Sequence, residues 1–123
     1  MPTVLIVDDE LNIRLLLRRI LESLKCTVQE AADVESAVTI LEQNAIDLAF
    51  IDVRMPGPDG LWLAENINQR FPRTAVVFAT GMHELDPRAT LRPGVIAYLV
   101  KPFRYEEVAD VVRGLERAGP PKA

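Results

Sequence analysis

Four short, continuously apolar runs, each followed by a polar or charged residue, place the strongest constraint on how this chain folds. Such runs are typical of strands that are buried on both faces of a sheet. Between them, apolar residues recur every three or four positions, which is the spacing of a helix with one buried face. This alternation predicts an α/β fold, in which helices cover both faces of a parallel sheet. The four runs are Val4–Val7, Leu48–Ile51, Ala75–Ala79 and Val95–Val100.

A fifth strand and five helices complete the expected pattern. Residues 27–31 include β-branched side chains with partial alternation and suggest a strand nearer an edge of the sheet. The first helix ends near Lys25, which would cost about 1 kcal/mol if it adopts the left-handed cap geometry. Asp33 is expected to cap the second helix, and Asn44 to end it in the left-handed conformation. The expected helices cover about residues 13–24, 34–43, 61–70, 88–92 and 105–118, and Pro87 and Pro93 limit the fourth to about two turns.

The first helix has the clearest stripe of apolar side chains. Its inward face is predicted to be Ile13, Leu16, Leu17, Ile20, Leu21 and Leu24, with Arg14, Arg18 and Glu22 on the far side. Trp62, in the third helix, is interpreted as a partly exposed surface residue, with a partner contact as the alternative. Together the elements form one domain over residues 1–118, and residues 119–123 are linker-like.

The composition excludes several classes of protein. A net charge of −4 over 123 residues argues against binding of nucleic acid by this domain. Cys26 is the single cysteine, so no internal disulfide forms and a reducing compartment is the simplest expectation. No apolar run approaches the ~18–20 residues of a membrane span, and no signal peptide is evident. We therefore expect a cytoplasmic protein.

Reactive side chains follow four of the five expected strands. Asp8 and Asp9 follow the first, Asp52 the third, Thr80 ends the fourth and Lys101 follows the fifth. Each has an ordinary alternative taken singly, since Asp9 could cap a helix, Asp52 and Thr80 could begin loops, and Lys101 could be solvated. Parallel strands place all their carboxyl ends at one edge of the sheet, where α/β proteins bind ligands. The set therefore predicts one shallow crevice that holds three carboxylates, a hydroxyl and an amine.

The chemistry of this set favours phosphoryl transfer. Three close carboxylates repel one another, so one pKa should rise unless a cation lies among them. Oxygen ligands suit a hard cation, Mg²⁺ with Mn²⁺ as an alternative. Mg²⁺ leaves positions open for phosphate oxygens, while Lys101 and Thr80 supply further positive charge and a donor. Asp52 is the acid best placed to act as the nucleophile.

The chain resembles the receiver domains of two-component response regulators, of the chemotaxis-regulator type. The residues that carry the resemblance are Val4–Glu10, Asp52–Gly60, Ala79–Gly81 and Gly94–Phe103. The matching segments span about residues 3–118 in the family's order. The resemblance implies a flavodoxin-like (βα)5 fold with strand order 2-1-3-4-5.

The resemblance also implies roles for individual residues. Asp52 would accept a phosphoryl group from a phosphohistidine of a sensor histidine kinase or histidine phosphotransfer protein. Asp8, Asp9, Asp52 and the backbone carbonyl of Arg54 would bind Mg²⁺. Lys101 would contact the phosphoryl group and precede a cis peptide bond to Pro102. Thr80 and Tyr98 would form a switch pair that alters the face of the last two strands and helices.

A receiver of this kind is not a turnover enzyme, and its expected partners follow from its role. They are the kinase or phosphotransfer protein, a separate effector or covalently linked output domain, and a second copy in a phosphorylation-dependent homodimer. The alternatives are a receiver-like interaction module that is not phosphorylated and, less favoured, an aspartyl-phosphate phosphatase. Arg54 stands where phosphatases of the haloacid dehalogenase type need a second acid.

Several positions depart from the family's usual pattern. Lys25 and Cys26 replace a common glycine, and Gly81 follows Thr80 where a residue such as alanine is common. Arg54 and Met82 flank the expected path of attacking water and should tune the lifetime of the acyl phosphate. His83 is interpreted as an exposed loop residue rather than a proton-transfer group.

Overall fold

All five expected strands form a single parallel sheet, in the order β2-β1-β3-β4-β5. The structure is a computed structural model and describes residues 2–55, 59–81 and 93–118. The strands are β1 (Thr3–Val7), β2 (Thr27–Ala31), β3 (Leu48–Ile51), β4 (Ala75–Thr80) and β5 (Val95–Val100). The helices are α1 (Leu11–Ser23), α2 (Val34–Gln43), α3 (Gly60–Arg70) and α4 (Tyr105–Ala118). The predicted sheet, strand order and edge position of residues 27–31 are therefore confirmed.

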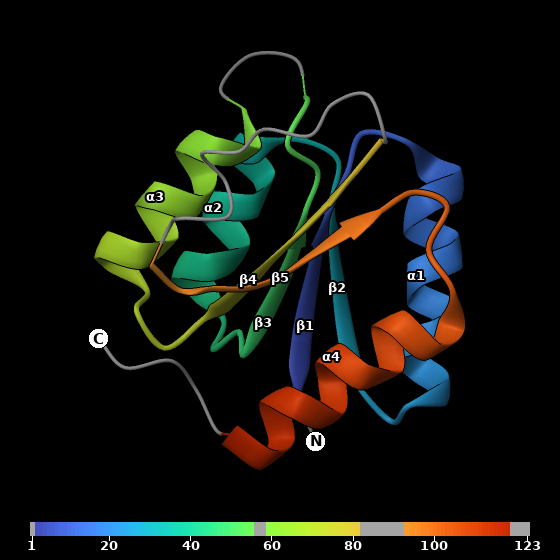
Figure 1. Cartoon of the computed structure of the whole chain (residues 1–123). Coiled ribbons are helices and arrows are strands. Elements are labelled where there is room, and N and C mark those ends of the chain that lie inside the picture. The colour runs from blue at the N-terminus through green and yellow to red at the C-terminus, as the bar shows by residue number, and fades with distance from the viewer. Residues whose placement is uncertain (1, 56–58, 82–92, 119–123) are drawn as a thin grey trace.

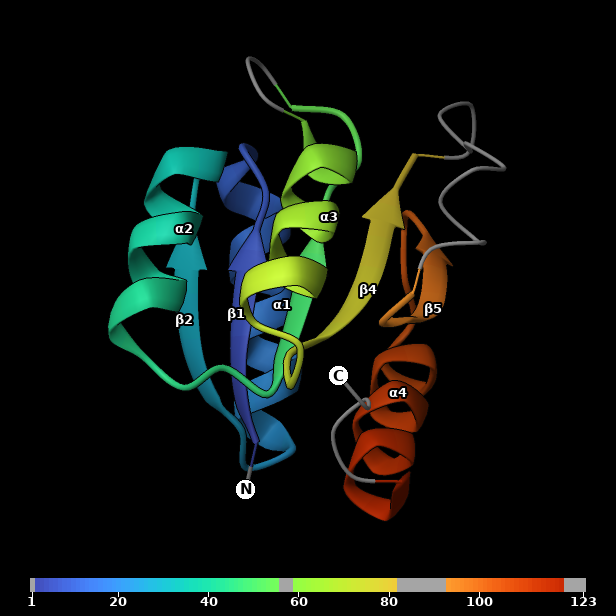
Figure 2. The same cartoon turned by 90° about the vertical axis from the view of Figure 1, so that its left-hand side faces the viewer.

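The helices lie in two layers, one on each face of the sheet. Figure 1 shows α2 and α3 on one side of the strands and α1 and α4 on the other, and Figure 2 views the sheet from the α2–α3 side. The central strand β3 is buried along its whole length, and its side chains alternate between the two layers. Ala49 and Ile51 join the core beneath α2 and α3, whereas Leu48 and Phe50 join the core beneath α1 and α4. This two-sided burial explains why the strands are continuously apolar in sequence.

The buried face of α1 differs from its predicted stripe. Leu17, Ile20 and Leu21 are buried there, but Leu16 is 40% exposed, because the buried stripe is narrower than the sequence suggests. Arg14 was also placed wrongly. Its side chain is only 15% exposed and is not solvated on the outer side of the helix, because it pairs with Glu30 of β2.

The ends of the helices provide a second test of the sequence prediction. Asp33 caps α2 by accepting a hydrogen bond from the Ser36 backbone N–H, as expected. Lys25 has a φ of 69°, so the left-handed conformation after α1 is present without glycine. The prediction for Asn44 is wrong, since its φ is −138° and its backbone is extended. Its side-chain amide donates instead to the Ile40 carbonyl, which satisfies an acceptor at the end of the helix.

Other predictions concern the loops and the surface. Trp62 is 47% exposed, which confirms a partly exposed position. The short helix expected at residues 88–92, the residues Met82 and His83, and the tail at 119–123 lie outside the described residues. Within the described residues, no helix has both the length and the apolar character to cross a membrane.

Candidate functional site

Two buried carboxylates stand side by side where the neighbouring strands β1 and β3 end. The strand register pairs Val7 with Ile51, so Asp8 and Asp52 follow adjacent positions. The Asp8 backbone N–H donates to the Ala31 carbonyl, and the Asp52 N–H donates to the Val7 carbonyl. These bonds extend the sheet pattern by one residue and hold both acids on rigid backbone. Asp8 is 2% exposed and Asp52 is 4% exposed.

Lys101 contacts the two acids from the end of β5, the edge strand of the sheet. It follows β5, and its Nζ lies 2.9 Å from Asp8 Oδ2 and 3.1 Å from Asp52 Oδ2. One ammonium therefore offsets one of the two negative charges and weakens the repulsion between the buried carboxylates, so the trio keeps a net charge of about −1. The backbone N–H of Arg54 donates to the other oxygen, Asp52 Oδ1, at 3.0 Å. The predicted meeting of Asp8, Asp52 and Lys101 is confirmed.

Burial dominates the acid–base character of Asp52. It raises the pKa of this carboxyl, while the bonds from the Arg54 N–H and Lys101 lower it, and the charge of Asp8 adds a small increase. The rise in pKa was predicted, but its main cause is loss of water rather than repulsion between acids. For Lys101, burial lowers the pKa and the bonds to Asp8 and Asp52 outweigh it, so the pKa is raised and the amine stays charged.

A second group of acids lies beside this pair. Carboxylate oxygens of Asp8, Asp9 and Glu10 all lie within 4.8 Å of one another. Asp9 and Glu10 are exposed, while Asp8 is buried and uses its Oδ1 to accept from the Glu10 backbone N–H. Glu10, not Asp9, is the residue that precedes α1, and it makes no side-chain cap bond. The ordinary interpretation of Asp9 as a helix cap is therefore excluded, and the oxygen-only donor set fits a hard divalent cation.

Thr80 ends β4, and Tyr98 lies in β5, the strand that leads to Lys101. The Thr80 carbonyl accepts from the Lys101 backbone N–H at 2.7 Å, and the residue is fully buried. Tyr98 is half-buried and its ring centroid lies 6.0 Å from that of Phe78. The register pairs Ile51 with Phe78, so Thr80 lies near the level of Asp52. The Lys101–Pro102 peptide is cis, as the resemblance implied.

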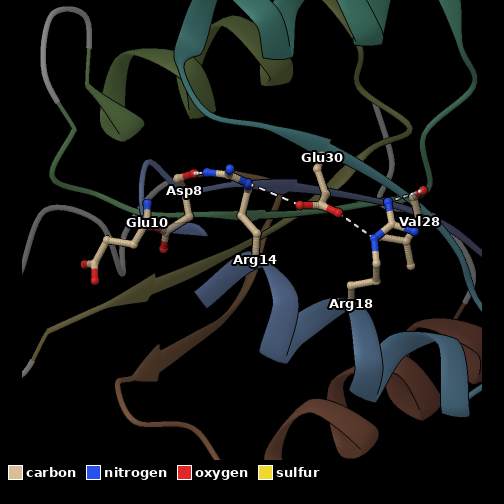
Figure 3. Close-up of polar contacts among 6 residues, drawn as sticks. All are labelled: Asp8, Glu10, Arg14, Arg18, Val28 and Glu30. Carbon is tan, nitrogen blue, oxygen red and sulfur yellow. Dashed lines mark hydrogen bonds and ion pairs between the residues drawn. The ribbon is translucent and has the colours of Figure 1, made fainter. Parts of the chain in front are cut away.

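Two supporting residues escaped the sequence analysis. At Gly60, an added Cβ would lie 2.2 Å from the Asp52 carbonyl oxygen, so only glycine allows α3 to begin this close to the acid. Arg14 Nη1 donates to the Asp8 carbonyl at 2.6 Å (Figure 3). Gly60 ends a segment that carries the resemblance to receiver domains, but the sequence does not show its close approach to the Asp52 carbonyl. An arginine in the first turn of a helix is a common feature, so Arg14 carried no distinctive signal.

The fold and the residues at the carboxyl ends of the strands define the class of protein. It is a flavodoxin-like α/β domain with an acidic pocket in which a lysine pairs with two carboxylates. The chain belongs to the response regulator receiver domain family, whose model matches residues 4–113. Receiver domains of this family act in two-component signalling rather than in catalytic turnover.

Relatives of the chain are longer regulatory proteins. It is 35% identical over 117 residues to the positive alginate biosynthesis regulatory protein of Pseudomonas aeruginosa, covering 93% of this chain and 47% of the relative. It is 36% identical over 110 residues to the DNA-binding transcriptional regulator NtrC of Klebsiella pneumoniae, covering 87% of this chain and 23% of that protein. The chain thus spans about half the length, or less, of these curated relatives.

Solved structures agree on the fold. The response regulator protein TrrA from Thermotoga maritima, in complex with Mg²⁺–BeF, has a TM-score of 0.83 and 29% identity, with 94% of this chain and 99% of that chain covered. The signal receiver domain of an HD domain-containing protein from Pseudomonas fluorescens has a TM-score of 0.87 and 28% identity, with 95% of each chain covered.

Proposed function

We propose that this chain is a phosphoacceptor that takes a phosphoryl group onto Asp52 from a phosphohistidine. An oxygen of Asp52 forms a bond to phosphorus as the phosphorus–nitrogen bond breaks, and the departing imidazole takes up a proton. Attack of water later releases inorganic phosphate and restores the carboxylate. The observation that carries this proposal is the contact of Lys101 Nζ with both Asp8 and Asp52 in a buried pocket.

Each residue of the pocket has a proposed part in that transfer. Lys101 is charged and already 3.1 Å from Asp52, so it is suited to hold an oxygen of the arriving phosphoryl group. The Arg54 N–H fixes Asp52 Oδ1 by a hydrogen bond, and Oδ2, which accepts from Lys101 in this structure, is the candidate nucleophile. Phosphorylation would draw Lys101 toward the new phosphoryl oxygens and weaken its contact with Asp8.

A divalent cation fits the acids next to Asp52. Asp8, Asp9, Asp52 and the backbone carbonyl of Arg54 would bind Mg²⁺ or Mn²⁺, and the close oxygens of Asp8, Asp9 and Glu10 support this choice. TrrA of Thermotoga maritima, a structural relative, was crystallised with Mg²⁺–BeF. When bound, the cation supplies positive charge that offsets the charge of the transferring group.

Thr80 and Tyr98 are the proposed switch. Thr80 is buried beside the pocket, and its carbonyl is bonded to the Lys101 backbone. A change in the position of Lys101 or of Thr80 would therefore act directly on the β4–β5 pair, which carries Tyr98. A local change of charge would in this way alter the outer face of the last two strands and helices.

The proposed partners follow from this role. A sensor histidine kinase or histidine phosphotransfer protein donates the phosphoryl group in the cytoplasm. A linked output domain or separate effector receives the signal, which the longer relatives support, and phosphorylation promotes a homodimer. Residues 1–118 form the receiver unit, since α4 continues to Ala118, and residues 119–123 serve as a linker.

Incubation of the chain with acetyl phosphate and Mg²⁺, followed by intact-mass spectrometry, tests the proposal. One phosphoryl group should be incorporated, be released by alkali or hydroxylamine as expected of an acyl phosphate, and be lost slowly after the donor is removed. Lys101→Ala should slow incorporation more than it weakens metal binding. Asp52→Asn should abolish incorporation, and EDTA should block it in the unmodified chain.

The alternatives give different results in the same assay. A chain that stays unmodified after long exposure to donor and Mg²⁺ is an interaction module rather than a phosphoacceptor. Continuous release of phosphate without accumulation of the modified chain would indicate a phosphatase. Labelling retained in Asp52→Asn would refute the assigned nucleophile.

A further inference from the structure

A series of hydrogen bonds and ion pairs connects the acidic pocket to the edge strand β2 (Figure 3). Arg14 donates from Nη1 to the Asp8 carbonyl at 2.6 Å and from Nε to Glu30 at 3.2 Å. Arg18 donates from Nε to the other Glu30 oxygen and from Nη1 to Glu22 at 3.0 Å. The Arg14 guanidinium thus links three elements: the end of β1, helix α1 and strand β2.

The hydrogen bond from Arg14 holds the peptide unit between Asp8 and Asp9. The Asp8 carbonyl belongs to the peptide unit that joins Asp8 to Asp9, and a peptide unit is planar. Holding its oxygen therefore fixes the direction in which the chain leaves toward Asp9. In the part of the chain that the structure describes, the Asp9 side chain is exposed and makes no hydrogen bond. Its position depends on its backbone.

Burial makes this link more effective than an ordinary surface ion pair. The side chains of Arg14 and Glu30 are 15% and 23% exposed, so water competes poorly for their hydrogen bonds. Glu30 accepts from both arginines, one on each carboxylate oxygen, which fixes its orientation. Arg14 is held in turn by Glu30, and its planar fork leaves Nη1 directed at Asp8.

We propose that Arg14 is a positioning residue for the cation site: its fork, seated on Glu30, orients the Asp8–Asp9 peptide so that both carboxylates face one cation. This inference rests on the proposed function, because it assumes that these acids bind a divalent cation. Partners that orient metal ligands commonly affect affinity although they do not touch the metal.

The charge of Arg14 predicts the opposite effect, which makes the inference testable. A guanidinium near a cation site repels the cation, so its removal by itself should tighten binding. Loss of positioning should weaken binding. The sign of the change in affinity on removing Arg14 therefore separates the two roles.

The experiment measures Mn²⁺ affinity by electron paramagnetic resonance and Mg²⁺ affinity by calorimetry on the complete 123-residue chain. Arg14→Met should weaken binding about 10-fold, in the range found for residues that orient metal ligands. Arg19→Met is the matched control, because Arg19 is exposed on the same helix and is bonded to neither Asp8 nor Glu30, and it should change affinity by less than about twofold. Labelling of Arg14→Met by acetyl phosphate should be slow at low Mg²⁺ and recover as Mg²⁺ is raised.

The contrary outcomes are distinct. Unchanged or tighter cation binding by Arg14→Met would overturn the inference, as would an equal loss in Arg19→Met, which would indicate a general effect of removing a charge from α1. If Arg14→Met fails to fold, Arg14→Lys decides: it keeps the charge but lacks the fork, so intermediate affinity is expected and unchanged affinity contradicts the proposal. If the chain without substitutions binds neither Mn²⁺ nor Mg²⁺, the proposed function itself is rejected.

Discussion

Asp52 meets two requirements that oppose each other. A nucleophilic carboxylate must be ionised, but the burial that holds Asp52 at the end of β3 raises its pKa. Lys101 and the Arg54 N–H both act against burial by stabilising the ionised form. In the absence of a cation they do not overcome burial completely, and the pocket therefore favours a further positive charge beside Asp52.

Asp52→Asn should make the chain more stable at pH 7 in EDTA. Because the folded-state pKa of Asp52 lies above the unfolded value of about 3.9, its contribution to stability is complete below that pH and is lost as the pH rises through the folded pKa. Asparagine retains an acceptor for the Arg54 N–H without the charge. Urea unfolding at several pH values should show a gain over the unmodified chain that shrinks toward pH 4.

Mg²⁺ should reduce this gain, since the carboxylate binds the cation more strongly than the amide does. Asp110→Asn is the control, because its side chain is 80% exposed and should alter stability little at any pH. A less stable Asp52→Asn chain at pH 7 in EDTA would mean that pairing with Lys101 outweighs burial.

Gly60→Ala should damage both the fold and the site. The new Cβ would meet the Asp52 carbonyl at 2.2 Å, so α3 or the acid-bearing backbone must move. Overpacking of this kind costs about 1–3 kcal/mol, and the shift should also slow phosphoryl incorporation. Gly114→Ala is the matched control: a Cβ there has nothing within 4 Å, and alanine should stabilise α4 by about 0.5–1 kcal/mol. Equal stabilities for the two variants, measured by urea unfolding, would contradict this account.

At the residue scale, the sequence predicted what the parallel direction of the strands alone determines. Asp8, Asp52 and Lys101 follow apolar runs, so a parallel sheet must bring them to one edge. Arg14 and Gly60 were not predicted, because their importance depends on distances to backbone carbonyls that only the packed structure specifies. The position of Arg14 in the helical pattern indicates a residue exposed to solvent. Only the folded structure shows that Glu30 of β2 lies beside it.

At the element scale, helix ends depend on individual residues. Asp33 accepts hydrogen bonds from Ser36, and the bond from the backbone N–H is the main cause that lowers its pKa. Since the folded pKa lies below the unfolded value of about 3.9, the contribution of the ionised cap is present above that value and is lost as the pH falls through the folded pKa. Asp33→Ala should therefore lower the urea midpoint at pH 7, and the difference should become smaller in strong acid.

Asp33→Asn separates charge from capping. Asparagine also caps helices, so stability at pH 7 should be largely retained while the dependence on acid is lost. Asp59→Ala, at the equivalent position before α3, should cost about 1 kcal/mol by the same mechanism, because Asp59 accepts from the Trp62 N–H. A midpoint for Asp33→Ala that matches the unmodified chain at pH 7 would show that this cap adds nothing.

The helices were predictable where one local rule decided the outcome. The last helix lies at residues 105–118 as predicted, and Asp33 caps α2 as its position before that helix predicted. Asn44 was predicted wrongly because two local solutions compete. Its side chain bonds the Ile40 carbonyl, and the backbone therefore does not need the left-handed turn.

At the scale of the molecule, the parallel sheet followed from the alternation of runs and stripes, but the strand order did not. Periodicity is the same for several doubly wound orders, and resemblance to a family supplied 2-1-3-4-5. The order matters for function, because it places β1 and β3 side by side at the centre and brings Asp8 next to Asp52. A different order with identical strands would separate these two acids.

The C-terminal limit of the folded unit gives a prediction about the whole molecule. The family match ends at residue 113, but α4 continues to Ala118 and Leu115 is buried in the core beneath α1 and α4. A chain cut after Arg113 loses this leucine and the last turn of α4, which should cost about 2–5 kcal/mol of unfolding free energy. A chain cut after Ala118 keeps both and should match the 123-residue chain in urea unfolding and in labelling by acetyl phosphate.

Leu115→Ala in the uncut chain should reproduce most of the loss, because the cause is removal of one buried side chain rather than of chain length. Equal stability for the chains ending at 113 and 118 would place the limit of the unit earlier and remove α4's last turn from the core.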